Sequence, residues 1–485
     1  MKILLAGYNI DSDLICELKE KSVLKQDITP ETISAAYARI SRSPKSVDAL
    51  RRDARTEVEK ARKSNRNIVF EMGHSSVAEH AVFNIDVIGV SRLLTEEIEK
   101  FRLCSYTEKS QRYVLFDKDF VVPEEITEAG LKDLFVATVG MQNDFYHQLY
   151  DQLRPYVFEQ NKTLAENPAN KSMLEGWAKE DARYAISLAT KTQLGMTINA
   201  RNLELMLRRL SALPLAEAHL CGEKLYSATK DIAPSLIRYT QATDYDRLTR
   251  RNLREVCETY GKEDKKRLPQ SARLVRTTKD ADIQSAAALL FASSGMSYDL
   301  CLKEAGRMKP ADAKALFKII FKNIQSYDAV LRELENIDML FELTMSASCF
   351  AQLKRHRMAT IISQDYNTTL GVTIPPAVRA IGLQKEFMAM IKKTNSAYEI
   401  IRHKRSAAAP YVLTNAHRRR VLMKLNAREL YHLARLRVDQ HAQWDIRDLS
   451  EKMLEQARRI MPLTLMMACG KDGFAARYKK IFPGA

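Results

Sequence analysis

Apolar and polar residues alternate over Val82–Ile88, which is typical of a β-strand with one buried face. A helix is predicted directly after this strand, from about Ser91 to Arg102. Apolar residues then recur at helical spacing after Asn199 and again after Asn426. The first set is Leu203, Met206, Leu207 and Leu210, and the second is Leu430, Leu433 and Leu436. Strands mixed with long helices predict an α+β or α/β fold.

The same pattern occurs twice in the chain. Ser91 and Ser346 begin similar segments at an offset of 255 residues. Asn199-Ala200-Arg201 and Asn426-Ala427-Arg428 repeat at an offset of 227 residues. The first copy therefore has about 28 additional residues between its two motifs, and we expect them in the polar stretch 159–172.

The repeat divides the chain into two predicted domains, residues 1–243 and residues 274–485. The segment 244–273 between them is rich in charged residues and contains Gly261 and Pro269. Such a composition is typical of a linker, with some helix. A length of 485 residues is sufficient for two domains.

Composition excludes several classes of protein. No apolar run approaches the ~20 residues of a membrane span. The apolar segment at the start of the chain is too short for the core of a signal peptide and predicts a first strand. The seven cysteines show no paired spacing, which predicts a reduced, cytoplasmic location and no metal site. The net charge of +16 implies anionic partners. Because the basic residues are spread along the chain, phosphorylated small molecules explain this charge as well as nucleic acid would as a partner.

Two groups of polar residues in the first copy are candidates for binding. Glycine at position 73 allows a tight bend before His74, and the serines that follow offer hydroxyl groups for a phosphate. The structural alternative is a helix start, with Ser76 as the N-cap and Glu79 completing a capping box. Further on, Glu108, Ser110 and Arg112 alternate, so an extended backbone would direct them to one side. They form either an anion cradle or the polar face of a strand.

The second copy contains two further candidates. Arg355-His356-Arg357 places three basic groups at consecutive positions, which a helix cannot direct to one side, so they serve different partners or lie on the surface. A helix predicted from Asn426 to Trp444 would place Asn426 and Arg437 on one face, with His441 one turn further. That polar stripe is either a solvent-facing surface or part of a site.

Together these segments resemble the flavin-dependent thymidylate synthases (ThyX), whose signature reads Arg-His-Arg followed by Glu-x-Ser-x-Arg-Tyr. The segments that carry the resemblance are 73–80, 102–113, 352–357, 426–428 and 437–444. The resemblance implies two ThyX-like domains, each a mixed sheet flanked by helices. It also implies a tetramer with active sites between subunits. Two fused copies would form half of that tetramer, so we expect a homodimer that acts as a pseudo-tetramer. Binding to nucleic acid or to membranes is not expected.

The resemblance also implies roles for particular residues. The arginine that favours ionisation of the uracil ring corresponds to Arg437. Contacts to dUMP are implied for Gln352, Arg355, Glu108, Ser110, Gln111, Arg112 and Arg183. Contacts to FAD are implied for Ser41, His74, Ser76, Glu79, His356, Arg357, Asn426, Arg428, His432 and His441. NADPH and methylenetetrahydrofolate are the implied co-substrates.

Each copy lacks part of the signature. The first copy has Lys100-Phe101-Arg102 in place of Arg-His-Arg, and Glu97 in place of the glutamine. The second copy departs at other positions: Ser363, Asp365 and Asn367 replace Glu, Ser and Arg, Ser326-Tyr327-Asp328 replaces the Gly-His segment, and Pro410 replaces the Arg183 equivalent. In the family, the residues kept by one copy and those kept by the other belong to opposite sides of one subunit interface. The losses are therefore complementary, and we predict one composite active site made by both copies.

Three functions remain open from the sequence. The first is a flavin-dependent thymidylate synthase that converts dUMP to dTMP. The second is a non-catalytic paralogue that binds flavin or nucleotide. The third group comprises related chemistry on another pyrimidine nucleotide and a basic nucleic-acid binder. Bound flavin separates the first two from the third group, and turnover of dUMP separates the first from the second.

Overall fold

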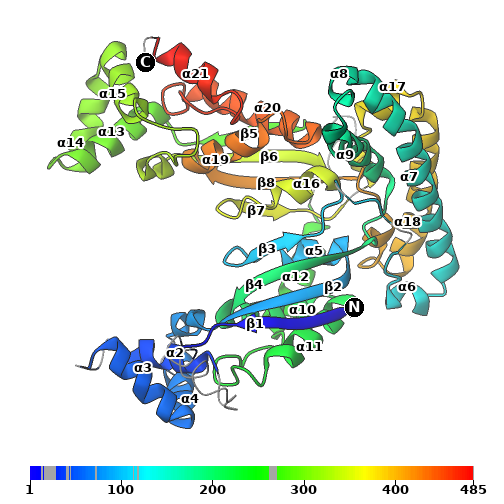
Figure 1. Cartoon of the computed structure of the whole chain (residues 1–485), viewed down its shortest axis with the longest axis horizontal. Coiled ribbons are helices and arrows are strands. Elements are labelled where there is room, and N and C mark those ends of the chain that lie inside the picture. Colours follow the sequence, from blue (N-terminus) through cyan, green and yellow to red (C-terminus); the bar gives the residue numbers. More distant parts are fainter. Residues whose placement is uncertain are drawn as a thin grey trace. The chain divides into compact units, whose positions relative to one another are not determined.

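The computed structural model describes residues 1–11, 15, 29–39, 43, 45–71, 74–112, 114–116, 119–260, 270–366 and 368–483 (Figure 1). The described residues form two compact units, each containing one four-stranded sheet with helices packed around it. The α+β fold class is thereby confirmed. None of the described helices has the length and apolar character needed to cross a membrane.

Unit 1 is built on the sheet order β1-β2-β4-β3. Its strands are β1 (Lys2–Tyr8), β2 (Val82–Ser91), β3 (Ser105–Glu108) and β4 (Lys191–Asn199). Its helices are α2 (Glu31–Arg39), α3 (Val47–Thr56), α4 (Val58–Arg66), α5 (Arg92–Ile98), α6 (Glu124–Glu128), α7 (Lys132–Gln160), α8 (Lys162–Ala165), α9 (Lys171–Ala182), α10 (Ala200–Ala212), α11 (Ala216–Thr229) and α12 (Asp244–Cys257). The predicted strand over 82–88 and the helix after it are confirmed, although the helix ends at Ile98.

Unit 2 repeats this arrangement with the order β5-β6-β8-β7. Its strands are β5 (Ala272–Thr277), β6 (Asp338–Ser346), β7 (Thr360–Ser363) and β8 (Arg418–Asn426). Its helices are α13 (Ala281–Ser293), α14 (Tyr298–Arg307), α15 (Pro310–Phe321), α16 (Ala347–Leu353), α17 (Pro376–Ala380), α19 (Ala427–Arg437), α20 (Trp444–Ile460) and α21 (Phe474–Ile481). In both units the described strand pairs are antiparallel, so the mixed strand directions implied by the resemblance are not found.

The two sheets differ by a single residue in their second strand. In β2 the register with β4 shifts between Ile88 and Val90, where Gly89 adopts a left-handed φ of 74°. A glycine in this conformation is a common way to form a β-bulge. The equivalent strand β6 pairs with β8 without a shift. The bulge therefore changes the repeat offset from 256 residues at the start of the strand to 255 at its end.

The two units exchange short segments of sequence. Unit 1 includes residues 385–413 of the second copy, and unit 2 includes Arg183–Ala185 of the first copy. Within unit 1, helix α18 (Gln384–Lys404) lies beside α7 (Figure 1). Gln142 of α7 donates hydrogen bonds to the hydroxyl of Thr394 and to the carbonyl of Val412, both at 2.9 Å, and the rings of Phe145 and Phe387 are 6.1 Å apart. In the first copy, α8 and α9 lie between α7 and Arg183–Ala185, whereas α18 is followed by the 3-10 helix Ala409–Val412, and α7 is also longer than α18 (29 against 21 residues).

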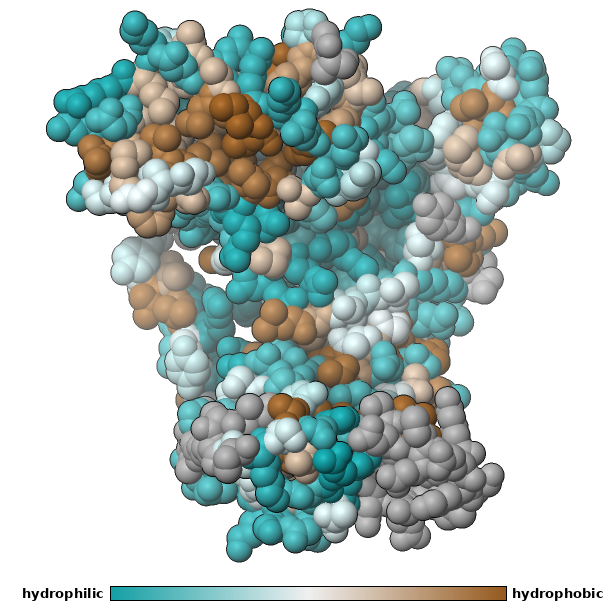
Figure 2. Space-filling view, turned by 60° about the vertical axis from the view of Figure 1, so that its left-hand side comes forward, coloured by the Kyte–Doolittle hydropathy of each residue, from teal (hydrophilic) through white to brown (hydrophobic). Residues whose placement is uncertain are grey.

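The predicted linker is divided between the units. Its first part forms α12 in unit 1, where Thr243 and Asp246 make a capping box, and its last residues begin β5 in unit 2. Exposed apolar side chains occur on the three-helix segment α13–α15 of unit 2, among them Phe291, Leu300 and Ile319. Figure 2 shows a hydrophobic patch in this part of the molecule. Unit 2 therefore carries an apolar surface away from its sheet.

Candidate active site

The Arg-His-Arg segment of unit 2 follows the short helix α16. Ser346, the last residue of β6, caps this helix by accepting a hydrogen bond from the backbone of Cys349 at 3.0 Å. The helix ends at Leu353, so Arg355-His356-Arg357 lies in a turn. Arg355 and Arg357 are exposed, whereas His356 is only 2% exposed. The two arginines thus face the surface and the histidine faces the interior, in agreement with the prediction that three consecutive side chains cannot point to one side.

His356 connects a buried carboxylate to Arg437. Its Nδ1 lies 3.1 Å from Oε1 of Glu429, and its Nε2 accepts a hydrogen bond of 3.2 Å from Nε of Arg437. Because an arginine can only donate, the proton of the neutral ring must be on Nδ1, where Glu429 accepts it. Burial lowers the pKa of His356, and the Arg437 cation acts in the same direction. His356 is therefore a neutral acceptor that orients Arg437.

A second contact fixes the position of Arg437. Its Nη2 donates to the backbone carbonyl of Gln352 at 3.2 Å. The guanidinium group, the Gln352 backbone and the His356 ring are therefore held together at one end of α16. This brings together two residues implied to act on the nucleotide, Gln352 and Arg437.

Arg183 of the first copy belongs to the same unit. The segment Arg183–Ala185 is held by Asn415, which donates to the carbonyl of Arg183 at 3.0 Å, and by the backbone of Ala416, which donates to the carbonyl of Tyr184 at 3.1 Å. Arg183 is 5% exposed. Burial raises the pKa of the Cys349 thiol, and the cations Arg437 and Arg183 both oppose this change. The backbone of Arg183–Ala185 is bound to Asn415 and Ala416 of the second copy.

Several polar residues that the sequence did not single out link these groups. Tyr184 donates to Oδ2 of Asp445 at 2.8 Å, and Gln443 donates to the Tyr184 hydroxyl at 2.9 Å. Gln352 in turn donates to Oε1 of Gln443 at 3.2 Å. The sequence offered two indications of these residues. Tyr184 directly follows the candidate Arg183, and Gln443 and Asp445 lie in or next to the segment 437–444 that carries the resemblance. Their connection depends on contacts between residues far apart in sequence.

Helix α19 differs from the prediction. It ends at Arg437, so the predicted helix from Asn426 to Trp444 is wrong and His441 does not lie on its polar stripe. The Asp439 side chain accepts hydrogen bonds from the backbones of His441 at 2.9 Å and Asp472 at 3.1 Å, which forms a turn. His441 is exposed in this turn, and its ring contacts Asp439.

Other residues assigned to flavin on this helix have structural partners. Asn426 is the N-cap and accepts from the backbone of Glu429 at 2.8 Å. Arg428 pairs with Glu335 at 2.8 Å. The exposed His432 makes an edge contact with the ring of His356, with centroids 5.6 Å apart.

In unit 1 the charged residues of the candidate phosphate cradle form ion pairs. Glu108 pairs with Arg92 and accepts from the Thr192 hydroxyl at 3.2 Å. Burial opposes the charge of Arg92, yet the Glu108 carboxylate raises the pKa of this arginine. Arg112 pairs with Glu180, and its backbone donates to the Ser110 hydroxyl at 3.1 Å. Both charged residues of the cradle thus have partners of opposite charge.

The remaining first-copy candidates lie elsewhere in unit 1. His74 and Ser76 are exposed at the short 3-10 helix Ser75–His80, and no side chain caps this helix. The capping box proposed for Ser76 and Glu79 is therefore wrong, since Glu79 pairs with Arg201 instead. Gln111 is buried, and Ser41 lies outside the described residues.

The ion pair Glu79–Arg201 has a counterpart in unit 2. Arg201 and Arg428 both follow the N-cap asparagine of a helix, and the partner of Arg428 is Glu335. The structural counterpart of Glu79 is thus Glu335, at the same offset of 256 residues as the starts of β2 and β6.

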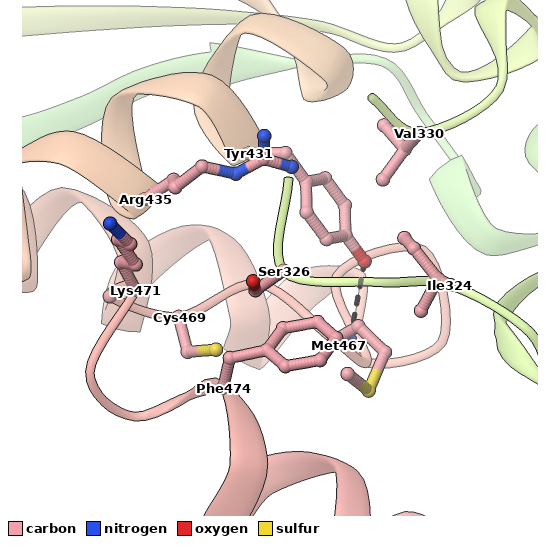
Figure 3. Close-up of a pocket in the computed structure, with 10 residues that line it drawn as sticks. Ile324, Ser326, Val330, Tyr431, Arg435, Met467, Cys469, Lys471 and Phe474 are labelled. Carbon is pink, nitrogen blue, oxygen red and sulfur yellow. Dashed lines mark hydrogen bonds between the residues drawn. The ribbon is translucent and has the colours of Figure 1, made fainter. Parts of the chain in front are cut away.

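A pocket in unit 2 lies on another face of α19 (Figure 3). Arg435 and Lys471 stand on one side of it, while Tyr431, Phe474 and apolar side chains form the rest of its wall. The Tyr431 hydroxyl accepts from the backbone of Met467 at 3.2 Å. Because residues two apart on a helix point in nearly opposite directions, Arg435 and Arg437 serve different faces of α19. The pocket is therefore separate from the groups around Arg437.

Comparison with known proteins identifies the class. The family model of the thymidylate synthase complementing proteins (Thy1) matches residues 22–235 and 273–463. The chain belongs to this family, with one match in each sequence copy.

Three relatives show how the two copies compare with known chains. A UPF0159 protein of Chlamydia muridarum is 26% identical over 432 residues, which cover 84% of this chain and 81% of that protein. A flavin-dependent thymidylate synthase of Clostridium tetani is 30% identical over 223 residues, which cover 45% of this chain and 85% of that protein. The crystal structure of ThyX from Helicobacter pylori complexed with FAD and dUMP aligns at 20% identity with a TM-score of 0.31, over 50% of this chain and 100% of that chain. The relative named as a synthase thus matches about half of this chain.

Proposed function

We propose that the protein is a flavin-dependent thymidylate synthase, which converts dUMP to dTMP with methylenetetrahydrofolate as carbon donor and NADPH as reductant. The observation that carries this proposal is the arrangement around Arg437. Its guanidinium is oriented by a neutral histidine and by the backbone of Gln352, and Arg183 lies in the same unit. A guanidinium held in a fixed orientation stabilises negative charge that develops on a uracil ring without having to reorganise.

The described residues fit an anionic nucleotide and a flavin in part. Arg355 and Arg357 are exposed on either side of His356 and are suited to phosphate groups. His432, His74 and Ser76 are also exposed. Asn426 and Arg428, in contrast, have internal partners, so we assign them to the support of α19. Bound FAD would supply the hydride chemistry, while the protein supplies orientation and charge.

We further propose that the active site is composite. The second copy would contribute Gln352, Arg355 and Arg437, and the first copy Glu108, Ser110, Arg112 and Arg183. The location of Arg183 in unit 2 supports this proposal, because a first-copy arginine already accompanies the second-copy set. We propose a homodimer as the working species, which light scattering of the purified protein tests directly.

The decisive experiment has two steps. The visible absorbance of the purified protein shows whether flavin is bound, and conversion of dUMP to dTMP in the presence of methylenetetrahydrofolate and NADPH tests the activity. Arg112→Ala and Arg437→Ala are then assayed singly and as a mixture. Recovery of activity in the mixture shows that each site uses residues of two chains, whereas no recovery shows that both sets come from one chain. Full activity of both single variants refutes the composite site.

A non-catalytic binding paralogue is the second candidate. The observation in its favour is that Glu108 and Arg112 are paired with Arg92 and Glu180, so these side chains have partners other than a nucleotide. Under this alternative the protein binds flavin or dUMP but forms no dTMP.

A further inference from the structure

Each unit contains a partly buried trio of serine, carboxylate and tyrosine, and the tyrosine comes from the other sequence copy. In unit 1, Ser91 donates to Oε2 of Glu217 at 2.7 Å, and Tyr411 donates to the same oxygen at 2.6 Å. Ser91 also caps α5. Burial raises the pKa values of Glu217 and of Tyr411. The trio therefore binds the exchanged segment 385–413 to the first copy.

Unit 2 repeats the trio at equivalent positions. Ser346 donates to Oδ2 of Asp445 at 2.5 Å, and Tyr184 donates to the same oxygen at 2.8 Å. Ser346 caps α16, just as the serine of unit 1 caps α5. Because both units have the trio, its basic role is to hold the exchanged segment in place.

Among the described residues, a chain of hydrogen bonds continues from the trio in unit 2 alone. Gln443, which is 1% exposed, precedes α20 and donates to the Tyr184 hydroxyl. The equivalent residue before α11 of unit 1 is Leu215, which cannot form a hydrogen bond through its side chain. Gln352, the next member of the chain in unit 2, corresponds to Glu97 in unit 1. The extension thus occurs only in the unit that also contains His356 and Arg437.

The direction of the hydrogen bonds follows from Asp445. Burial raises the pKa of Asp445, and the hydroxyls of Ser346 and Tyr184 oppose this by donating to its carboxylate. Because the Tyr184 hydroxyl donates to Oδ2 of Asp445, its oxygen can accept from Nε2 of Gln443. Oε1 of Gln443 consequently accepts from Nε2 of Gln352. This leaves Oε1 of Gln352 as a buried acceptor with no hydrogen bond among the described residues. A buried acceptor is costly unless a donor reaches it.

We propose that Gln443 is a positioning residue that holds the amide of Gln352 with its carbonyl oxygen toward the nucleotide. The inference rests on the proposed function. The nucleotide must then present a donor to this oxygen, either the imide N–H of uracil or the 3′-hydroxyl of the sugar. A ligand without that donor leaves the Gln352 oxygen unpaired and should bind roughly tenfold more weakly.

The test compares three nucleotides by calorimetry: dUMP, dCMP, which lacks the imide N–H, and 2′,3′-dideoxyuridine monophosphate, which lacks the 3′-hydroxyl. In the unchanged protein one analogue should bind more weakly because it lacks the donor. In Gln443→Leu, which introduces the residue found in unit 1, the amide of Gln352 can turn over and this particular difference should shrink. A difference that persists unchanged, or an equal weakening of all three ligands, overturns the inference. Failure of the unchanged protein to bind any of the three refutes the proposed function itself.

The two tyrosines provide a matched control. Tyr184→Phe and Tyr411→Phe each remove a hydroxyl group that donates to a partly buried carboxylate, and both should lower thermal stability to a similar extent. Only Tyr184→Phe removes the acceptor of Gln443, so only this variant should reduce the difference between the nucleotides. Equal effects of both variants on nucleotide discrimination would show that the trio acts through general stability and would overturn the positioning role.

Discussion

His417 should make unit 2 sensitive to acid. The ring is completely buried beside the start of β8, and its Nδ1 accepts a hydrogen bond from the backbone of Thr414 at 2.9 Å. Burial lowers the pKa of His417 from 6.5 to about 4. Protonation of Nδ1 would also break the bond from Thr414. The folded protein therefore keeps this ring neutral where the unfolded chain would bind a proton.

The sign and size of the effect follow from this difference in pKa. Above pH 6.5 the ring is neutral in both states, and its contribution to stability is complete. As the pH falls, the unfolded chain gains a proton first, so the free energy of unfolding decreases until the folded ring also protonates near pH 4. At ~1.4 kcal/mol per unit of pKa, the loss between about pH 7.5 and about pH 4.5 is about 2.5 kcal/mol.

His417→Asn is the matched variant, because the asparagine oxygen can accept from Thr414 but does not titrate. The chain has two tryptophans, Trp177 and Trp444, and the second stacks on Tyr184 within unit 2. In a Trp177→Phe background, fluorescence during urea denaturation then reports the unfolding of unit 2. The free energy of unfolding should fall between these two pH values by about 2.5 kcal/mol more with His417 than with asparagine. An equal fall in both proteins would refute the reasoning.

Three further predictions follow from the candidate site. Arg437→Ala should slow turnover of dUMP roughly 10²–10³-fold with a smaller change in dUMP affinity, and rapid-quench kinetics with calorimetry separate the two effects. Flavin titration should saturate near one per chain, since each copy lacks part of the signature; two equivalent tight sites would contradict that interpretation. Asn426→Ala and Asn199→Ala should each destabilise the protein by about 1 kcal/mol because each removes an N-cap, and an Asn426→Ala variant with normal stability but weak flavin binding would argue against the structural assignment.

The sequence by itself determined the fold class and the repeat. Alternation over 82–88 and helical spacing after Asn199 and Asn426 are local patterns, and they predict the same elements whatever surrounds them. Local patterns do not predict where contacts with distant residues end a helix. The helix expected to continue from Asn426 to Trp444 ends at Arg437, because Asp439 and the distant Asp472 stabilise a turn there.

Only the tertiary structure decided which copy supplies which residue. The exchange of segments 183–185 and 385–413 places Tyr184 against Asp445 and Tyr411 against Glu217, and these contacts join residues more than 190 positions apart. The burial of His356 between Glu429 and Arg437 likewise depends on contacts between the turn that follows α16 and helix α19. A hydrogen bond between distant residues leaves no periodic signal in the sequence, because its partners are chosen by the faces that meet after folding.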